Sequence, residues 1–151
     1  NLKFHIAGRN TPDALKALNI KNIVVHGEVP DAIRFMENYT MMVVPLFSGS
    51  GMRVKILEGM ALSMVVITTE MGKEGIYAEN GEHLLVADSP DAFISQIASV
   101  LSGDKDRKKI GEAAKSFVED YYDHGVNAKK LLEKYKTLKS DPDYRKIPAI
   151  S

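Results

Sequence analysis

The sequence predicts an α/β fold, in which helices cover both faces of an open, parallel β-sheet. Short apolar runs alternate along the chain with amphipathic stretches, which is the pattern of strands joined by crossover helices. At 151 residues the chain is long enough to bury one hydrophobic core. It contains no cysteine, so neither a disulfide nor a thiol nucleophile can contribute.

Five apolar runs are predicted to be strands, because each is short and ends in turn-forming or polar residues. They cover Leu2–Ala7, Ile23–His26, Met41–Leu46, Val65–Thr68 and Leu84–Val86. The first two strands stop at Gly8 and Gly27. The third, Met41–Leu46, carries no charged residue, and we expect it to be a buried parallel strand.

Amphipathic segments between and after these strands are predicted to be helices. They cover Thr11–Leu18, Pro30–Tyr39, Met52–Leu62, Asp91–Leu101, Asp104–Tyr121 and Val126–Leu138. We expect Thr11 to cap the first helix, with Pro12 at its first position. In the third helix, apolar residues recur at helical spacing at Val54, Leu57 and Ala61. The last residues, 139–151, contain two prolines and are expected to form a loosely structured tail.

The turn between the third strand and its helix is the most informative part of the chain. Gly49 and Gly51 alternate with serines there, and the helix follows directly. Backbone N–H groups and the dipole at a helix N-terminus favour an anion such as a phosphate. Arg53 and Lys55 lie close enough in the sequence to neutralise a diphosphate. This corner is therefore predicted to bind a phosphorylated ligand.

Glu58 lies seven residues after Gly51, about two helical turns away on the same face, with Lys55 between them. A carboxylate can accept hydrogen bonds from two adjacent ribose hydroxyls. We therefore expect Glu58 to hold a ribose beside the phosphate. The alternative is that Glu58 and Lys55 form an i,i+3 ion pair on a solvated helix face.

Open parallel sheets bind their ligands beyond the carboxyl ends of the strands. Four loops are expected at that edge, and each follows a predicted strand. They are Gly8–Asn10, Gly27–Glu28, Ser48–Gly51 and Glu70–Gly72. We expect these loops to converge around the glycine-rich turn.

Other chemistries match the sequence less well. The dinucleotide fingerprint is partial, since Val54 replaces its third glycine, although Glu70 stands where a ribose-binding acid belongs. Neither a P-loop triplet nor a G-x-S-x-G nucleophile elbow occurs. The histidines are scattered without metal-ligand spacing, so no metal or cofactor is expected. They are His5, His26, His83 and His124. Two alternative functions stay open for the chain: a dinucleotide-binding domain of an oxidoreductase and a non-catalytic binding module.

The overall charge and hydropathy narrow the range of partners. Basic and acidic residues number 20 each, so a general affinity for nucleic acid is not expected. No apolar run approaches the roughly 20 residues that span a bilayer, and no signal peptide opens the chain. The lack of cysteine is compatible with the cytoplasm or the inner face of a membrane. The chain starts at Asn1 beside a strand, and we expect it to be a fragment.

Six segments in a fixed order carry a resemblance to a known family. They are Leu2–Gly8, Val24–Val29, Val43–Pro45, Gly49–Ala61, Gly72–Ile76 and Asn80–Val86. Together they resemble the C-terminal domain of a family 4 (group 1) glycosyltransferase of the GT-B architecture. The resemblance implies a Rossmann-like, donor-binding domain over residues 1–138, including its C-terminal helices.

The resemblance also implies roles for individual residues. Glu58 matches the second Glu of the family's E-x7-E motif, which holds the donor ribose. Ser50 stands where the first Glu contacts the transferred sugar, as in a glycine-rich subgroup. Backbone amides of Gly51, Met52 and Arg53 would then contact the sugar and the diphosphate. The implied substrate-binding residues are Gly49, Ser50, Gly51, Met52, Arg53, Lys55 and Glu58, and no catalytic residue is assigned to this half.

Two parts of the family pattern are missing from this chain. The phosphate-binding Arg and Lys of the family precede the Leu2 strand, and so does the N-terminal acceptor-binding domain. The resemblance implies that the intact enzyme is a retaining, metal-independent transferase in polysaccharide biosynthesis, acting on a nucleoside-diphosphate sugar and a glycan or lipid-linked acceptor. We expect the isolated chain to be inactive. Ser63 and Met64 replace the usual Gly and Pro after the motif helix, which should affect packing only.

Overall fold

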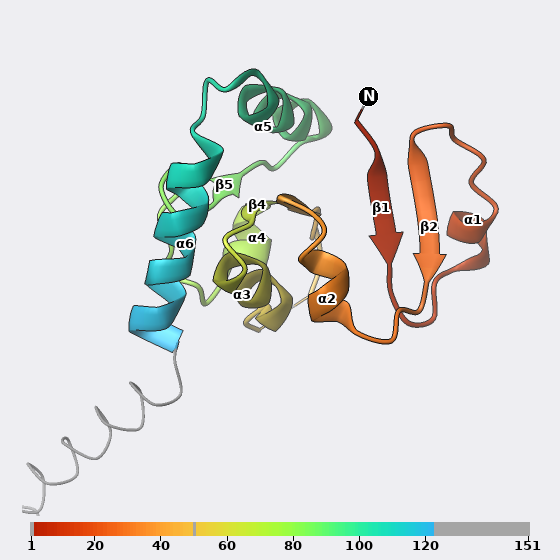
Figure 1. The fold of residues 1–151 in the computed structure, drawn as a ribbon, viewed down its shortest axis with the longest axis horizontal. Helices are drawn as coiled ribbons and strands as arrows, with labels where there is room; N and C mark the ends of the chain where they lie inside the picture. The colour runs from red at the N-terminus through yellow and green to blue at the C-terminus, as the bar shows by residue number, and fades with distance from the viewer. Residues whose placement is uncertain (1, 50, 123–151) are drawn as a thin grey trace, which may run out of the picture. The chain divides into compact units, whose positions relative to one another are not determined.

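The computed structural model describes residues 2–49 and 51–122. The chain divides into two compact units, Asn1–Thr40 and Met41–Ser151, and each has its own parallel sheet (Figure 1). The predicted helix Val126–Leu138 and the predicted tail lie outside the described residues.

The first unit contains two parallel strands and two short helices (Figure 1). Its elements are β1 (Phe4–Ala7), α1 (Asp13–Lys16), β2 (Ile23–Gly27) and α2 (Ala32–Met36). Both strands were predicted, and both helices are shorter than their amphipathic segments. The carboxylate of Asp31 caps α2 by accepting a hydrogen bond of 3.1 Å from the N–H of Arg34.

The predicted cap of the first helix is wrong. The Thr11 hydroxyl donates a hydrogen bond of 2.8 Å to the carbonyl of Gly8 and closes the loop after β1. Since that hydroxyl is engaged there, Pro12 takes the N-cap position of α1, and no side chain caps this helix within the described residues. Pro12 therefore precedes the first helical residue, Asp13, instead of being that residue.

The second unit is built on a three-stranded parallel sheet in the order β3-β4-β5. Its strands are β3 (Met41–Val44), β4 (Val65–Thr68) and β5 (Leu85–Val86). All four residues of the central strand β4 are buried. The prediction that Met41–Leu46 is a buried strand is wrong in part, because β3 lies at an edge of this sheet and its residues are only half-buried.

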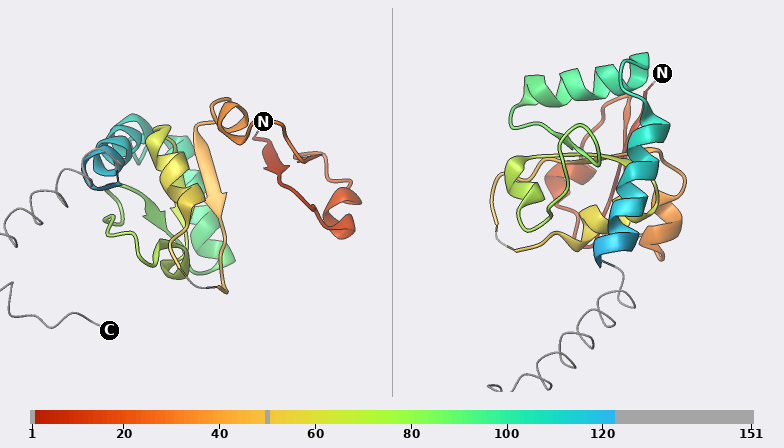
Figure 2. Two further views of the ribbon diagram at one scale, coloured as in Figure 1. Left: turned by 90° about the horizontal axis from the view of Figure 1, so that it is seen from below. Right: turned by 90° about the vertical axis from the view of Figure 1, so that its left-hand side faces the viewer.

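Helices cover both faces of this sheet, which confirms the predicted fold class (Figure 2). The helices α3 (Val54–Ala61) and α6 (Arg107–Tyr122) pack in one cluster with Val66 of β4. The helix α5 (Pro90–Ser102) packs in the other cluster with Val65 and Ile67. The alternation along β4 thus assigns its neighbouring side chains to opposite faces of the sheet. One further short helix, α4 (Glu70–Lys73), replaces a predicted loop.

The buried face of α3 differs from the one suggested by its apolar spacing. Ile56, Gly59 and Met60 are buried, whereas the Val54 side chain is 60% exposed and Ala61 is also exposed. A glycine thus occupies part of the core-facing stripe, which an apolar count over the sequence does not register.

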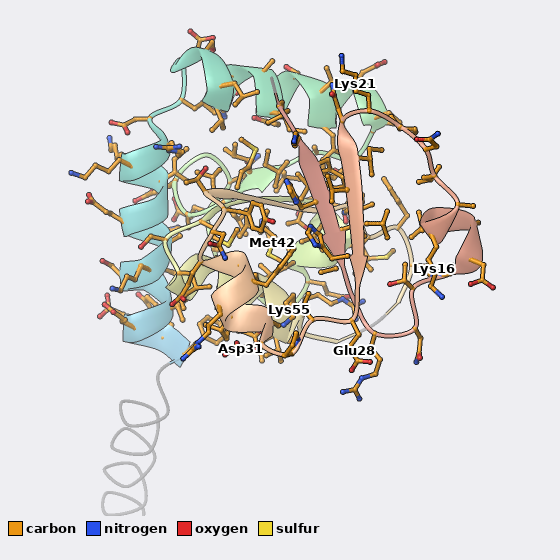
Figure 3. All side chains as sticks on the ribbon, turned by 45° about the vertical axis from the view of Figure 1, so that its right-hand side comes forward. Lys16, Lys21, Glu28, Asp31, Met42 and Lys55 are labelled. Atoms are coloured by element: carbon orange, nitrogen blue, oxygen red, sulfur yellow. The ribbon has the colours of Figure 1, made fainter. Side chains whose placement is uncertain are left out.

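Two glycines let helices approach their neighbours closely in the second unit. A Cβ built on Gly59 of α3 would lie 2.8 Å from Sδ of Met42, a side chain labelled on β3 in Figure 3. A Cβ on Gly111 of α6 would lie 2.2 Å from the backbone oxygen of Ser63, in the turn after α3. Both glycines therefore hold α3 in place, one against the sheet and one against α6, which lies beside α3 in Figure 1.

Candidate functional site

The carboxyl ends of β3 and β4 lie at the same edge of the sheet, because the two strands are parallel. Two threonine hydroxyls join these ends. The Thr68 hydroxyl donates a hydrogen bond of 3.0 Å to the carbonyl of Val44. The Thr69 hydroxyl donates to the carbonyl of Leu46 and accepts from the N–H of Gly72 at 2.9 Å. The loops that follow β3 and β4 are thereby fixed relative to each other.

The glycine-rich turn leaves this edge in a backbone conformation that favours glycine. Gly49 has a φ of 119° and Gly51 a φ of 84°. Ser50, which lies between them, is outside the described residues. The turn leads into α3 with Arg53 at the N-cap position, and no side chain of the described residues caps this helix. The first turn of α3 therefore has backbone donors that no side chain satisfies.

The Arg53 side chain folds back over the turn. A Cβ built on Gly49 would lie 2.8 Å from Nη2 of Arg53, and the Nε and Nη2 atoms of this guanidinium are buried. Glycine at position 49 thus makes room for the guanidinium as well as allowing the positive φ. The result is a positive charge beside Gly49 in the turn.

Lys55 and Glu58 form the i,i+3 ion pair that was one of the two expectations for them. Nζ of Lys55 lies 2.5 Å from Oε2 of Glu58, and the two side chains are 51% and 34% exposed. A carboxylate accepts hydrogen bonds on two oxygens, and this ion pair occupies Oε2. The pair therefore holds the carboxylate in place and is compatible with a ligand on the same group.

Met52 lies between the turn and the loop that follows α4. A Cβ built on Gly75 would lie 3.7 Å from Cβ of Met52. The Tyr122 hydroxyl donates a hydrogen bond of 3.3 Å to the carbonyl of Gly75, which ties this loop to α6. Large apolar side chains are exposed along this edge of the unit, namely Phe47, Met52, Val54 and Met71.

Of the four loops that were expected to converge, two lie close together within each unit. In the first unit, the N–H of Gly8 donates to the carbonyl of Gly27 at 2.7 Å, and Nε of Arg9 lies 2.9 Å from Oε1 of Glu28. Figure 3 shows Glu28 at the carboxyl ends of β1 and β2. In the second unit, the Ser48–Gly51 turn and the segment around Gly72 share one edge through the Thr69 hydroxyl.

Three residues that position this edge were not identified from the sequence: Thr68, Thr69 and Asp88. Thr69 is the N-cap of α4, and the Asp88 carboxylate accepts a hydrogen bond of 2.9 Å from the N–H of Glu70. A threonine directly before an acidic residue at the end of a strand is an N-cap signal that could have identified α4.

Three of the four histidines have partners in the structure, and His124 lies outside the described residues. Nδ1 of His5 and Nε2 of His26 lie 2.9 Å apart across β1 and β2. Nδ1 of His83 accepts a hydrogen bond of 3.0 Å from the N–H of Glu79. The described residues contain no group of three or more potential metal ligands. They also contain no helix that is long and apolar enough to cross a membrane.

Comparison with protein families shows which family the chain belongs to. The family described as "Glycosyl transferases group 1" matches residues 1–103. The chain belongs to the group 1 glycosyl transferases. This match confirms the resemblance carried by the sequence motifs. The glycine-rich turn and Glu58 both lie within the matched residues.

One curated relative and several solved structures are similar to this group 1 domain. The relative is an uncharacterized 44.6 kDa protein in the cps region of Klebsiella pneumoniae, 26% identical over 105 residues. That match covers 70% of this chain, which spans only 27% of the relative's length.

The solved structures share the fold. The C-terminal domain of the group 1 protein LpcC from Francisella tularensis has a TM-score of 0.59 and 21% identity, covering 69% of this chain and 55% of its own. A glycosyltransferase from Rickettsia africae has a TM-score of 0.66 and 23% identity, covering 93% and 41%. The pneumococcal O-GlcNAc transferase GtfA, solved with UDP and GlcNAc, has a TM-score of 0.65 and 17% identity, covering 90% and 28%. The chain therefore has the fold of the C-terminal half of a GT-B glycosyltransferase.

Proposed function

We propose that this chain is the donor-binding half of a retaining glycosyltransferase that transfers a sugar from a nucleoside-diphosphate sugar to a glycan or lipid-linked acceptor. The observation that carries the proposal is the turn formed by Gly49 and Gly51, which opens onto α3 without a side-chain cap and has the Arg53 guanidinium beside it. Membership in the group 1 family supports the same reading.

The proposed division of roles follows the geometry of the turn and helix. The backbone amides of Gly51, Met52 and Arg53 bind the diphosphate and the sugar, because a helix N-terminus favours an anion. The Arg53 guanidinium contributes positive charge next to these amides. Glu58, about one turn into α3 and held by Lys55, accepts hydrogen bonds from the ribose hydroxyls.

The proposed chemistry requires little more than charge stabilisation from this half of the enzyme. The departing nucleoside diphosphate gains negative charge as the sugar leaves, and preorganised amides and cations stabilise that charge. No residue of this half is assigned as an acid, base or nucleophile, and no metal is included in the mechanism. Because position 50 is a serine and not the first glutamate of the family motif, backbone groups and the rest of the enzyme recognise the sugar.

The proposal also extends to the complete protein. We infer a donor-binding domain over residues 1–138 and a tail over residues 139–151, with an N-terminal domain supplying the acceptor site. The isolated chain is then inactive. A role in polysaccharide synthesis is supported by the relative in a cps region, and the chemistry is assigned to the cytoplasmic side, where nucleoside-diphosphate sugars would be supplied.

A nucleotide panel tests the proposal by thermal unfolding of the chain. With a nucleotide at about 10 mM, UDP, GDP or ADP should raise the Tm, because a ligand that binds only the folded state stabilises it by mass action. NAD should have no effect, and Glu58→Ala should remove the response while leaving the Tm of the free protein close to that of the wild type. Protection by NAD alone would instead favour a dinucleotide site, and indifference to every nucleotide would favour a non-catalytic module.

A further inference from the structure

A cavity lies in the second unit, and none of its described lining residues belongs to the glycine-rich turn or to α3. It has a volume of about 590 Å³ and lies between the segment 77–83 and one side of α6. The residues that line this cavity include Tyr77, Glu79, Glu82, His83, Phe117 and Tyr122. The donor site proposed above therefore does not account for this cavity.

The floor of this cavity is aromatic. Phe117 of α6 is only 8% exposed, and its ring centroid lies 4.7 Å from that of His83 and 5.8 Å from that of Tyr122. Tyr77 stands at the rim with a side chain that is 87% exposed. Large aromatic surfaces at a cavity are typical of recognition sites, because rings offer an apolar body and a negative face.

The charged side chains of the described residues that line the cavity are acidic. Glu79 and Glu82 contribute carboxylates from the segment 77–83, and no Lys or Arg is among the lining residues of the described chain. Asp120 also lines the cavity and has interactions of its own, so the two glutamates supply the charge on which the argument depends. Nδ1 of His83 accepts a hydrogen bond from the N–H of Glu79, and Nε2 of His83 lies 4.0 Å from Oε1 of Glu82.

We propose that this cavity binds an arginine side chain from a basic segment of a partner protein. A guanidinium stacks on an exposed aromatic face such as that of Tyr77, and it donates paired hydrogen bonds to carboxylates such as those of Glu79 and Glu82. The volume exceeds what a bare cation fills, so a side chain with an apolar stem is the better fit. A phosphorylated or acidic ligand would be repelled by the same carboxylates.

A titration monitored by the amide NMR signals of the full chain tests this inference. The probe is the peptide acetyl-Gly-Arg-Arg-Gly-amide, and the matched control replaces both arginines by citrulline, which has the same shape without the charge. The arginine peptide should shift the amide signals of residues 77–83 and 113–122 with saturation. The citrulline peptide should bind about tenfold more weakly, because the charge-assisted contacts are lost.

Substitutions identify the cavity as the binding site. The double variant Glu79→Gln and Glu82→Gln should weaken binding of the arginine peptide about tenfold, since it removes two exposed ion-pair partners. Glu119→Gln is the matched control, because Glu119 is an exposed carboxylate of α6 that pairs with Lys115 and does not line the cavity. This control should change the affinity less than about twofold. All three glutamates are exposed, so the fold should be retained.

Three results would overturn the inference. One is equal binding of the arginine and citrulline peptides, or no binding of either. Another is equal weakening by the double variant and by Glu119→Gln. The third is saturable binding of a neutral sugar such as maltotriose at this cavity in place of the peptide. Since none of these experiments involves a nucleotide, their outcome is independent of the donor-binding proposal.

Discussion

At the scale of single residues, the candidate site depends on backbone conformations and close contacts more than on reactive side chains. Gly49 combines a φ of 119° with a guanidinium 2.8 Å from where its Cβ would be. Gly51 has a positive φ as well, but nothing of the described chain lies within 4 Å of its Cβ position. The two glycines therefore have different reasons to be glycine.

We predict that Gly49→Ala costs more stability than Gly51→Ala. Both substitutions force an alanine to adopt a positive φ, which costs about 1–2 kcal/mol. At position 49 the new methyl group must also displace the Arg53 guanidinium. Urea unfolding of the two variants measures the difference, and an equal loss at both positions would show that the contact with Arg53 contributes nothing.

Ser63 was expected to affect packing only, but it has a φ of 57° in the turn after α3. The serine therefore also strains the backbone, because this left-handed conformation favours glycine. We predict that Ser63→Gly stabilises the chain by up to about 1 kcal/mol, because relief of the left-handed strain exceeds the added freedom of the unfolded chain.

The reverse change provides the control for Ser63→Gly. Gly103 ends α5 with a φ of 86° and has no described atom within 4 Å of its Cβ position. Gly103→Ser should therefore destabilise the chain by about 1 kcal/mol. Thermal unfolding of both variants measures the two changes in stability. A loss of stability in Ser63→Gly would show that the positive φ of Ser63 does not strain the chain.

At the scale of elements, the strands were easier to predict than the helices. The bounds of β4 match the predicted Val65–Thr68, because a short apolar run between turns has few alternatives. The cap at Thr11 was wrong, since its hydroxyl closes a loop, and α4 was missed because a single helical turn has no periodicity. The buried stripe of α3 was missed because it includes Gly59, whose role depends on Met42 across the interface.

The contact between α3 and α6 predicts a strong effect at Gly111. A Cβ there would lie 2.2 Å from the backbone oxygen of Ser63, and a backbone atom cannot move aside as a flexible side chain would. Gly111→Ala should therefore destabilise the second unit by about 2–3 kcal/mol, as overpacking does in a tight core.

The neighbouring exposed position provides the control for Gly111→Ala. Glu112 pairs with Lys108 on the surface of α6, and such pairs contribute little. Glu112→Ala should change stability by less than about 0.5 kcal/mol. Chemical denaturation of both variants provides the comparison, and similar midpoints for the two would mean that α6 does not approach Ser63 closely.

At the scale of the whole molecule, the sequence was sufficient for the fold class and the family but not for the contacts of the site. The alternation of apolar runs with amphipathic stretches predicted the α/β fold, and six segments in a fixed order predicted the group 1 family. The family match over residues 1–103 confirms the family. The position of the Arg53 guanidinium over Gly49 and the hydrogen bonds of Thr69 depend on residues brought together by folding. Spacing along the chain does not encode such contacts.

The central claim is that Glu58 and the glycine-rich turn together bind a nucleoside diphosphate. The most direct measurement is an NMR titration of the chain with UDP, GDP and ADP, performed on the wild type and on Glu58→Gln. One of the nucleotides should shift the amide signals of Gly49, Gly51 and Arg53, with a Kd at least about tenfold weaker in Glu58→Gln, because that variant loses the charged acceptor of the ribose. Unchanged affinity in Glu58→Gln, or shifts that avoid the turn, would contradict the account.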